Sequence, residues 1–170
     1  MPAHMKRWSA TLRSAFLVTS VGWTAVLPLT SWIAGRAHAP SLLYAAAATV
    51  YTIGALVCHQ LPVRSFQLWA VQMPVCARCV GIYGGAAIAS VLSGCVGRAF
   101  QASHVRSAES LALRVNRLAI LAAVAPTALT LVYEWWSGQM PANWIRAASG
   151  VPIGVMVTAL VVAATGDQVN

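Results

Sequence analysis

The chain has 170 residues, of which 59% are hydrophobic and only 8% carry a charge. A soluble domain usually contains about 25% charged residues, so this composition excludes an ordinary soluble protein and indicates an integral membrane protein. The net charge of +8 comes from basic residues that flank apolar segments, without a basic stripe that includes aromatic residues. We therefore expect the lipid bilayer and its anionic headgroups as partners, and no binding of nucleic acid.

Apolar segments with the length of a membrane-spanning helix, about 20 residues, recur along the chain. In chain order, we expect spans at about residues 14–34, 41–58, 75–96, 118–136 and 145–164. No linker or low-complexity segment separates them. The expected fold is therefore all-α, a polytopic transmembrane bundle of about five spans in a single domain covering residues 1–170.

The orientation of this five-span layout is open. We interpret the first apolar segment, which follows Lys6, Arg7 and Arg13, as an uncleaved span rather than a signal peptide. With five spans, six basic residues fall on the side of the N-terminus and five on the other, so the positive-inside rule does not select an orientation. Because the first span often dominates, we favour a cytoplasmic N-terminus.

Three of the four cysteines lie in the segment CHQLPVRSFQLWAVQMPVCARC, residues 58–79, between the second and third expected spans. Cys58 and His59 end one span, and Cys76 and Cys79 open the next. Two helices joined by a short connector are expected to run antiparallel, which places both motifs at one membrane face. Together they form a Cys₃His set, a common arrangement around zinc.

One geometric condition applies to this metal site. Neighbouring residues on a helix point about 100° apart, so Cys58 and His59 can bind one ion only if the helix unwinds at Cys58. Pro62 and the change to polar composition favour such unwinding. Otherwise Gln60 or water provides the fourth ligand, with His59 as a supporting partner.

The C-x-x-C pair at a helix start also allows other interpretations. The helix N-terminus and Arg78 both favour a thiolate, which suits a membrane thiol–disulfide oxidoreductase with Cys76 and Cys79 as the active pair and Cys58 as a relay. Alternatively, the protein is a transporter or membrane scaffold in which the cysteines only pack. Cys95 lies about 24 Å from Cys79 along the same expected helix, so we expect it to pack in the core.

A second group of polar residues flanks the last two spans. Glu134 lies near the end of the fourth span, Arg146 opens the fifth and is its natural partner, and Asn143 completes a polar cluster. In the five-span layout this cluster faces the same side as the cysteines. Arg64 and Arg78 either meet lipid phosphates or offset the net charge of −1 that three thiolates and one zinc ion carry.

Small residues mark two helix faces for close packing. Gly81 and Gly85 form a G-x-x-x-G pair in the third span, and Gly150 and Gly154 form another in the fifth. Such pairs let helices approach closely in lipid. They also allow association into a homo-oligomer or a membrane complex.

The strings C-H-Q-x-P-x-R-S-F and M-P-V-C-A-R-C-V-G-I-Y-G-G resemble the signature of an uncharacterised prokaryotic family, domain of unknown function 2085. The segment N-W-I-R at 143–146, followed by Gly150 and Gly154, is similar to a second block of that family, so the resemblance covers about residues 50–155. It implies a small multi-pass protein of the prokaryotic inner membrane and supplies no reaction. Its residues are Cys58, His59, Gln60, Arg64, Ser65, Phe66, Cys76, Arg78, Cys79, Gly81, Ile82, Tyr83 and Gly85. From this signature, Tyr83 joins the candidate polar residues around the site.

Overall fold

The structure is a computed structural model that describes the backbone of residues 3–100 and 117–166 and the side chains of residues 8–94 and 117–165. The side chain of Cys95 lies outside these ranges. The elements in chain order are α1 (Ala3–Ala34), α2 (Ser41–Val57), the 3₁₀ turn η1 (Pro62–Arg64), β1 (Gln67–Leu68), β2 (Val71–Gln72), α3 (Ala77–Phe100), α5 (Arg117–Ser137) and α6 (Asn143–Gly166). The expected all-α helical bundle is confirmed.

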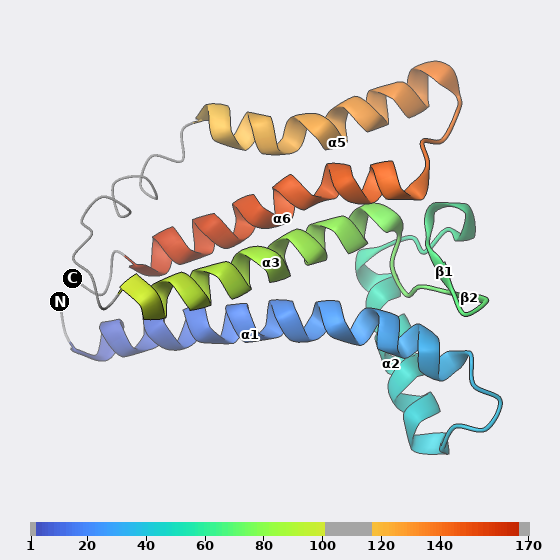
Figure 1. The fold of residues 1–170 in the computed structure, drawn as a ribbon, viewed down its shortest axis with the longest axis horizontal. Coiled ribbons are helices and arrows are strands. Elements are labelled where there is room, and N and C mark those ends of the chain that lie inside the picture. Colours follow the sequence, from blue (N-terminus) through green and yellow to red (C-terminus); the bar gives the residue numbers. More distant parts are fainter. Residues whose placement is uncertain (1–2, 101–116, 167–170) are drawn as a thin grey trace.

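Four long helices run along the same axis of the molecule (Figure 1). Helix α3 lies between α1 and α6, with which it makes the most extensive contacts, and α5 packs on the outer side of α6. The beginning of α1 and the end of α6 lie at one end of the bundle. The connector between α2 and α3 and the junction between α5 and α6 lie at the other end.

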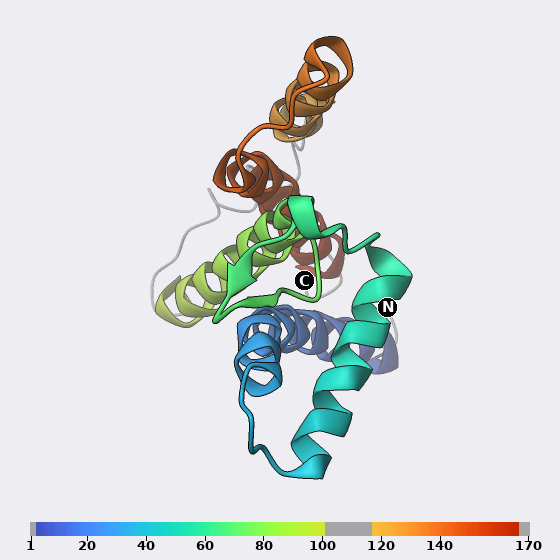
Figure 2. The ribbon, with the colours of Figure 1, turned by 90° about the vertical axis from the view of Figure 1, so that its right-hand side faces the viewer.

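The second expected span differs from the prediction. Helix α2 has 17 residues and runs across the bundle axis rather than along it, as both views show (Figures 1 and 2). At 1.5 Å per residue it is about 25 Å long, short of the roughly 30 Å hydrocarbon core. Four helices of the described chain are long and apolar enough to span: Trp8–Ala34, Ala77–Gly94, Arg117–Ser137 and Asn143–Thr165. Residues 41–57 therefore form a shorter apolar helix that crosses the bundle, in place of the antiparallel second span expected at residues 41–58.

The direction of α2 changes the end of the bundle at which the cysteines lie relative to the start of α1. A bundle with four long helices places the start of α1 and the start of α3 at opposite ends (Figure 1). The segment containing Cys58, Cys76 and Cys79 therefore lies at the end away from the start of α1, whereas the five-span layout had put them on the same side.

The outer surface of the bundle is rich in large apolar side chains. Trp136 is 91% exposed, Trp135 82% and Leu121 63%, all on α5. Helix α2 likewise exposes Leu42 and Leu56. In a soluble protein such patches would drive association, whereas lipid tails cover them in a membrane. The surface thus agrees with the composition.

The α3–α6 contact is built from glycines. A Cβ atom on Gly81 would lie 1.8 Å from the backbone oxygen of Ala147, and one on Gly154 would lie 1.9 Å from that of Ile82. Gly85 and Gly150 are equally crowded by backbone oxygens, at 2.2 and 2.4 Å. The two helices therefore approach so closely that no side chain fits at these positions.

The connector between α2 and α3 folds into a compact cap. Strands β1 and β2 pair antiparallel, with Leu68 opposite Val71, and Trp69 and Ala70 form the two-residue turn. Both turn residues have positive φ, 52° and 60°, which is the conformation of the type I′ turn that matches strand twist. The hairpin contacts α1 and lies beside the start of α3 (Figure 1).

Candidate metal centre

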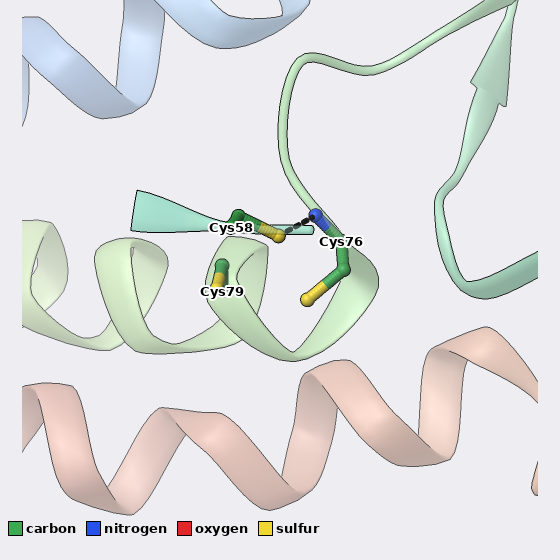
Figure 3. Close-up of side chains that lie close together, drawn as sticks. All are labelled: Cys58, Cys76 and Cys79. Atoms are coloured by element: carbon green, nitrogen blue, oxygen red, sulfur yellow. Dashed lines mark hydrogen bonds between the residues drawn. The ribbon is translucent and has the colours of Figure 1, made fainter. Parts of the chain in front are cut away.

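Three cysteines meet where the connector joins α3. The sulfur atoms of Cys58, Cys76 and Cys79 all lie within 4.8 Å of one another. Figure 3 shows Cys58 approaching from the end of α2, while Cys76 lies immediately before α3 and Cys79 lies in its first turn. All three are free thiols, with Cys58 buried and the other two half-buried. Residues from two elements thus present three soft ligands to one point, which could hold a thiophilic metal ion.

Cys58 reaches this point because α2 ends immediately before it. Its backbone is extended, with φ −149° and ψ 138°, so the helix unwinds where the metal hypothesis needed it to. In extended chain, successive side chains point to opposite faces. His59 is accordingly exposed and does not belong to the group of sulfurs, although it lines the neighbouring cavity. The structure thus brings together a Cys₃ set and not the expected Cys₃His set.

Side-chain amides hold this unwound segment in place. Gln60 has a positive φ of 48°, and its Nε2 donates to the backbone oxygens of Tyr51 in α2 (2.8 Å) and Pro74 before α3 (2.6 Å). Gln72 Nε2 in turn donates to the Gln60 carbonyl at 2.5 Å, and the Tyr51 hydroxyl donates to the Gln72 carbonyl at 2.5 Å. Gln60 therefore acts on the backbone that positions Cys58 and Cys76.

Hydrogen bonds at the start of α3 favour negative charge on the sulfur of Cys76. The backbone N–H of Cys76 donates to Cys58 Sγ at 3.1 Å, the hydrogen bond drawn in Figure 3. Cys76 lies immediately before α3, where a hydrogen bond from the Cys79 side chain outweighs burial and lowers its pKa from 9.0 to about 5. Such a thiol is a thiolate at neutral pH, the form that binds metals and attacks disulfides.

A second polar cluster lies beside the sulfurs and is centred on Glu134 of α5. Its carboxylate is 2.7 Å from Arg146 Nη2, 3.2 Å from Arg78 Nη2 and 3.6 Å from Arg64 Nη2. Arg78 also donates to Thr130 Oγ1 at 3.0 Å. Arg146 and Glu134 are almost fully buried, Arg78 is partly buried, and Arg64 is 40% exposed. One carboxylate thus joins η1, α3, α5 and α6.

The two clusters share one cavity of about 390 Å³. Its lining includes all three cysteines of the cluster, His59, Gln60 and three arginines: Arg64, Arg78 and Arg146. The expectation that the cysteine end and the Glu134–Arg146 end face the same side therefore describes their positions correctly. An ion bound by the three sulfurs would be accessible from this cavity and would lie near the charges of its arginines.

Two other expected residues lie next to the site rather than in it. Asn143 Nδ2 donates to the backbone oxygen of buried Ser65 at 3.1 Å, which ties the start of α6 to the connector. Tyr83 packs against the core that contains Cys58, and its ring meets Trp23 edge-on at 6.2 Å. Sequence reasoning did not identify the roles of Ser65, Gln72 and Thr130, although the R-S-F string of the signature contains the first of them.

Comparison with known proteins agrees with this arrangement. A protein-family profile described as "Predicted membrane protein (DUF2085)" matches residues 58–160. The chain belongs to the DUF2085 family. The DUF2085 match begins at Cys58 and includes Cys76, Cys79, Glu134 and Arg146, so it covers both clusters and most of the four-helix part.

One curated relative matches a short part of the chain. The protein named "Uncharacterized protein MJ1492" from Methanocaldococcus jannaschii is 44% identical over 43 residues, which cover 25% of this chain and 28% of that protein. The chain thus matches just over a quarter of the length of that relative. No solved structure matches the chain. The family match and the four long apolar helices therefore establish the family and the membrane character of the chain.

Proposed function

We propose that this DUF2085 protein is a single multi-pass membrane domain that holds one thiophilic metal ion, of the zinc class, through Cys58, Cys76 and Cys79. The observation that carries the proposal is the convergence of the three sulfurs within 4.8 Å. The sulfurs come from two segments of the chain, the end of α2 and the start of α3, and zinc and other soft cations favour such sets. The metal would join the end of α2 to the start of α3, and its fourth coordination position would be available to the cavity.

The surrounding charges fit this role. Three thiolates and a divalent ion carry a net charge of −1, which is unfavourable at a partly buried site. Arg78 lies between two of the cysteines in sequence and lines the same cavity, as do Arg64 and Arg146. These guanidinium groups support an anionic metal–thiolate centre at low dielectric.

Metal analysis of detergent-purified full-length protein tests the proposal. We expect about one metal ion per chain in the wild type and almost none in Cys76→Ser or Cys79→Ser. Cys95→Ser is the matched control, because that residue is 16 positions beyond Cys79 on α3. Metal-free wild type, or Cys76→Ser with an undiminished metal content, would overturn it.

A second candidate function is thiol–disulfide exchange, favoured by the lowered pKa of Cys76 and its contact with Cys79. Oxidation of the Cys76 thiolate and the Cys79 thiol would form a disulfide, release one proton and pass two electrons to an acceptor such as a quinone, which takes up two protons as it becomes a quinol, with Cys58 as the relay. Mapping of disulfides after rapid alkylation in membranes separates the two functions. A disulfide that interconverts with the dithiol in metal-free protein supports the exchange function; uniformly metal-bound thiols contradict it.

We also infer that the start of α1 faces the cytoplasm and the cysteine end faces the opposite side of a prokaryotic inner membrane. With four spans, seven basic residues belong to the side of the α1 start and four to the cysteine side. Three of those four contact Glu134. The positive-inside rule therefore gives an orientation that five spans could not give. The two sets are Lys6, Arg7, Arg13, Arg98, Arg106, Arg114 and Arg117 against Arg36, Arg64, Arg78 and Arg146.

Site-specific labelling tests this orientation. Trp69, at the tip of the hairpin, is 59% exposed, so a Trp69→Cys variant offers an accessible thiol at the cysteine end. In spheroplasts, a membrane-impermeant maleimide should label Trp69→Cys above the parent protein. A cysteine introduced by Asn170→Cys should react only after permeabilisation. The reverse pattern would contradict the inferred orientation.

A further inference from the structure

The cluster around Glu134 contains more positive charge than it can neutralise. Arg64, Arg78 and Arg146 all approach this one carboxylate, which leaves two positive charges in excess. The only other acidic residues of the sequence, Glu109 and Asp167, lie outside the described residues. A bound zinc ion with three thiolates would remove only one of the two excess charges. The cluster thus remains cationic with or without the proposed metal.

The same cluster is short of hydrogen-bond acceptors. Arg146 is only 2% exposed, yet its Nη1 has no hydrogen-bond partner among the described residues. Nε of Arg78 is likewise buried without a partner in the described part of the chain. Leaving a buried charged donor unsatisfied is costly, and native proteins rarely do so without a reason. A cationic site with unused donors favours an anion as the missing component.

The cavity next to these arginines provides the space. Its volume is about 390 Å³, against roughly 30 Å³ for one water molecule in the liquid. Arg146 lies almost fully buried in its lining, while Arg64 is 40% exposed, so the arginines span from the interior towards the surface. Guanidinium groups bind phosphate oxygens through paired, charge-assisted hydrogen bonds.

We propose that this cavity is a binding site for a phosphate-type oxyanion, held by Arg64, Arg78 and Arg146 beside the three cysteines. The anion supplies the missing negative charge and accepts hydrogen bonds from the arginines. It is either a free phosphate group or the headgroup of an anionic lipid, because the chemistry recognised is the same. The proposal depends on the arginines and not on the metal, so the two can fail separately.

Calorimetric titration of detergent-purified full-length protein with inorganic phosphate tests the site. We expect saturable binding to the wild type and an affinity about tenfold lower for Arg64→Gln. Arg64 is chosen because its exposure makes the substitution compatible with folding. Arg64→Lys keeps the charge without the paired geometry and should fall between the two. Arg36→Gln is the matched control, because Arg36 is outside the cavity and stacks on Trp32 at 3.7 Å.

A second arm identifies the source of the phosphate group. Native mass spectrometry of the same proteins with added phosphatidylglycerol should show a retained lipid if a headgroup fills the cavity, and Arg64→Gln should lose it. Binding of either probe that weakens in Arg64→Gln but not in Arg36→Gln supports the proposal and assigns the source. No saturable binding of either probe, or equal binding by Arg64→Gln, overturns it. Metal content is measured on the same samples: metal-free wild type that binds the anion refutes the metal proposal alone.

Discussion

Along their length, α3 and α6 are held together by glycines whose missing side chains let the backbones touch. Where the same two helices begin, Arg78 and Arg146 both contact the carboxylate of Glu134 from α5, beside a cavity. The first region has no room for an added atom, and the second has room but depends on charge. This protein thus combines a rigid apolar contact with an open polar end. The two regions should therefore fail in opposite ways: one when an atom is added, the other when a charge is removed.

The largest effect is expected at the polar end. Glu134→Gln removes the only negative charge that three arginines approach in the described structure and leaves Arg146 buried without an ionic partner. Breaking a buried ion pair in this way costs about 3–5 kcal/mol of unfolding free energy. Thermal and denaturant unfolding in detergent measure the loss. Tyr133→Phe is the control, since Tyr133 is 49% exposed; equal stability of the two variants would refute the assigned role of Glu134.

The next effect is expected in the glycine region. Gly154→Ala places a Cβ atom 1.9 Å from the backbone oxygen of Ile82, so the two helices must separate. Overpacking of this kind costs about 1–3 kcal/mol. Gly84→Ala is a matched control on α3, because its Cβ would meet nothing within 4 Å. A similar unfolding midpoint for both variants would show that the close contact contributes little.

A smaller effect links the charges to the metal. Arg78→Gln removes a guanidinium group that we expect to offset the anionic metal–thiolate centre. Loss of such a supporting residue typically lowers metal affinity about 10–100-fold. Competition with a chromogenic chelator measures this, with Arg36→Gln as the control. Unchanged metal affinity would mean that Arg78 acts only through its contacts with Glu134 and Thr130.

The smallest effect is expected at His59. This side chain is exposed and separate from the group of sulfurs, so His59→Ala should leave metal content and chelator competition close to those of the wild type. Such a result would show that His59 lines the cavity without binding the metal. Loss of metal in this variant would instead restore the Cys₃His set that the sequence predicted.

The sequence predicted the membrane bundle and the meeting of three cysteines, because these depend on composition and on residues near each other in the chain. The elements that bring the cysteines together differ from those expected. Helix α2 lies across the bundle, and Gln60 and Gln72 bring the cysteines together through hydrogen bonds rather than through an antiparallel helix pair. Apolar composition identifies a helix but does not give its direction, so the layout of residues 41–58 could not be derived.

The polar end shows the other limit of the sequence. Arg146 was expected near Glu134 because the two are close in the chain. Arg64 and Arg78 are 70 and 56 residues away from Glu134, and no local pattern signals that they approach it. The cationic excess, and with it the anion site, became visible only when four segments were placed around one carboxylate. The position of His59 outside the group of sulfurs has a related cause, since the backbone beyond Val57 decides where this side chain points.

The proposed metal centre is tested by the sulfur coordination of the metal in purified protein, measured by X-ray absorption at the edge of the metal found. For zinc, we expect three sulfur neighbours at about 2.3 Å and one lighter atom from the cavity side. Cys58→Ser should reduce the sulfur count by one or release the ion. A metal surrounded only by nitrogen and oxygen, or a wild-type protein that binds none, would contradict the claim that Cys58, Cys76 and Cys79 form a metal centre.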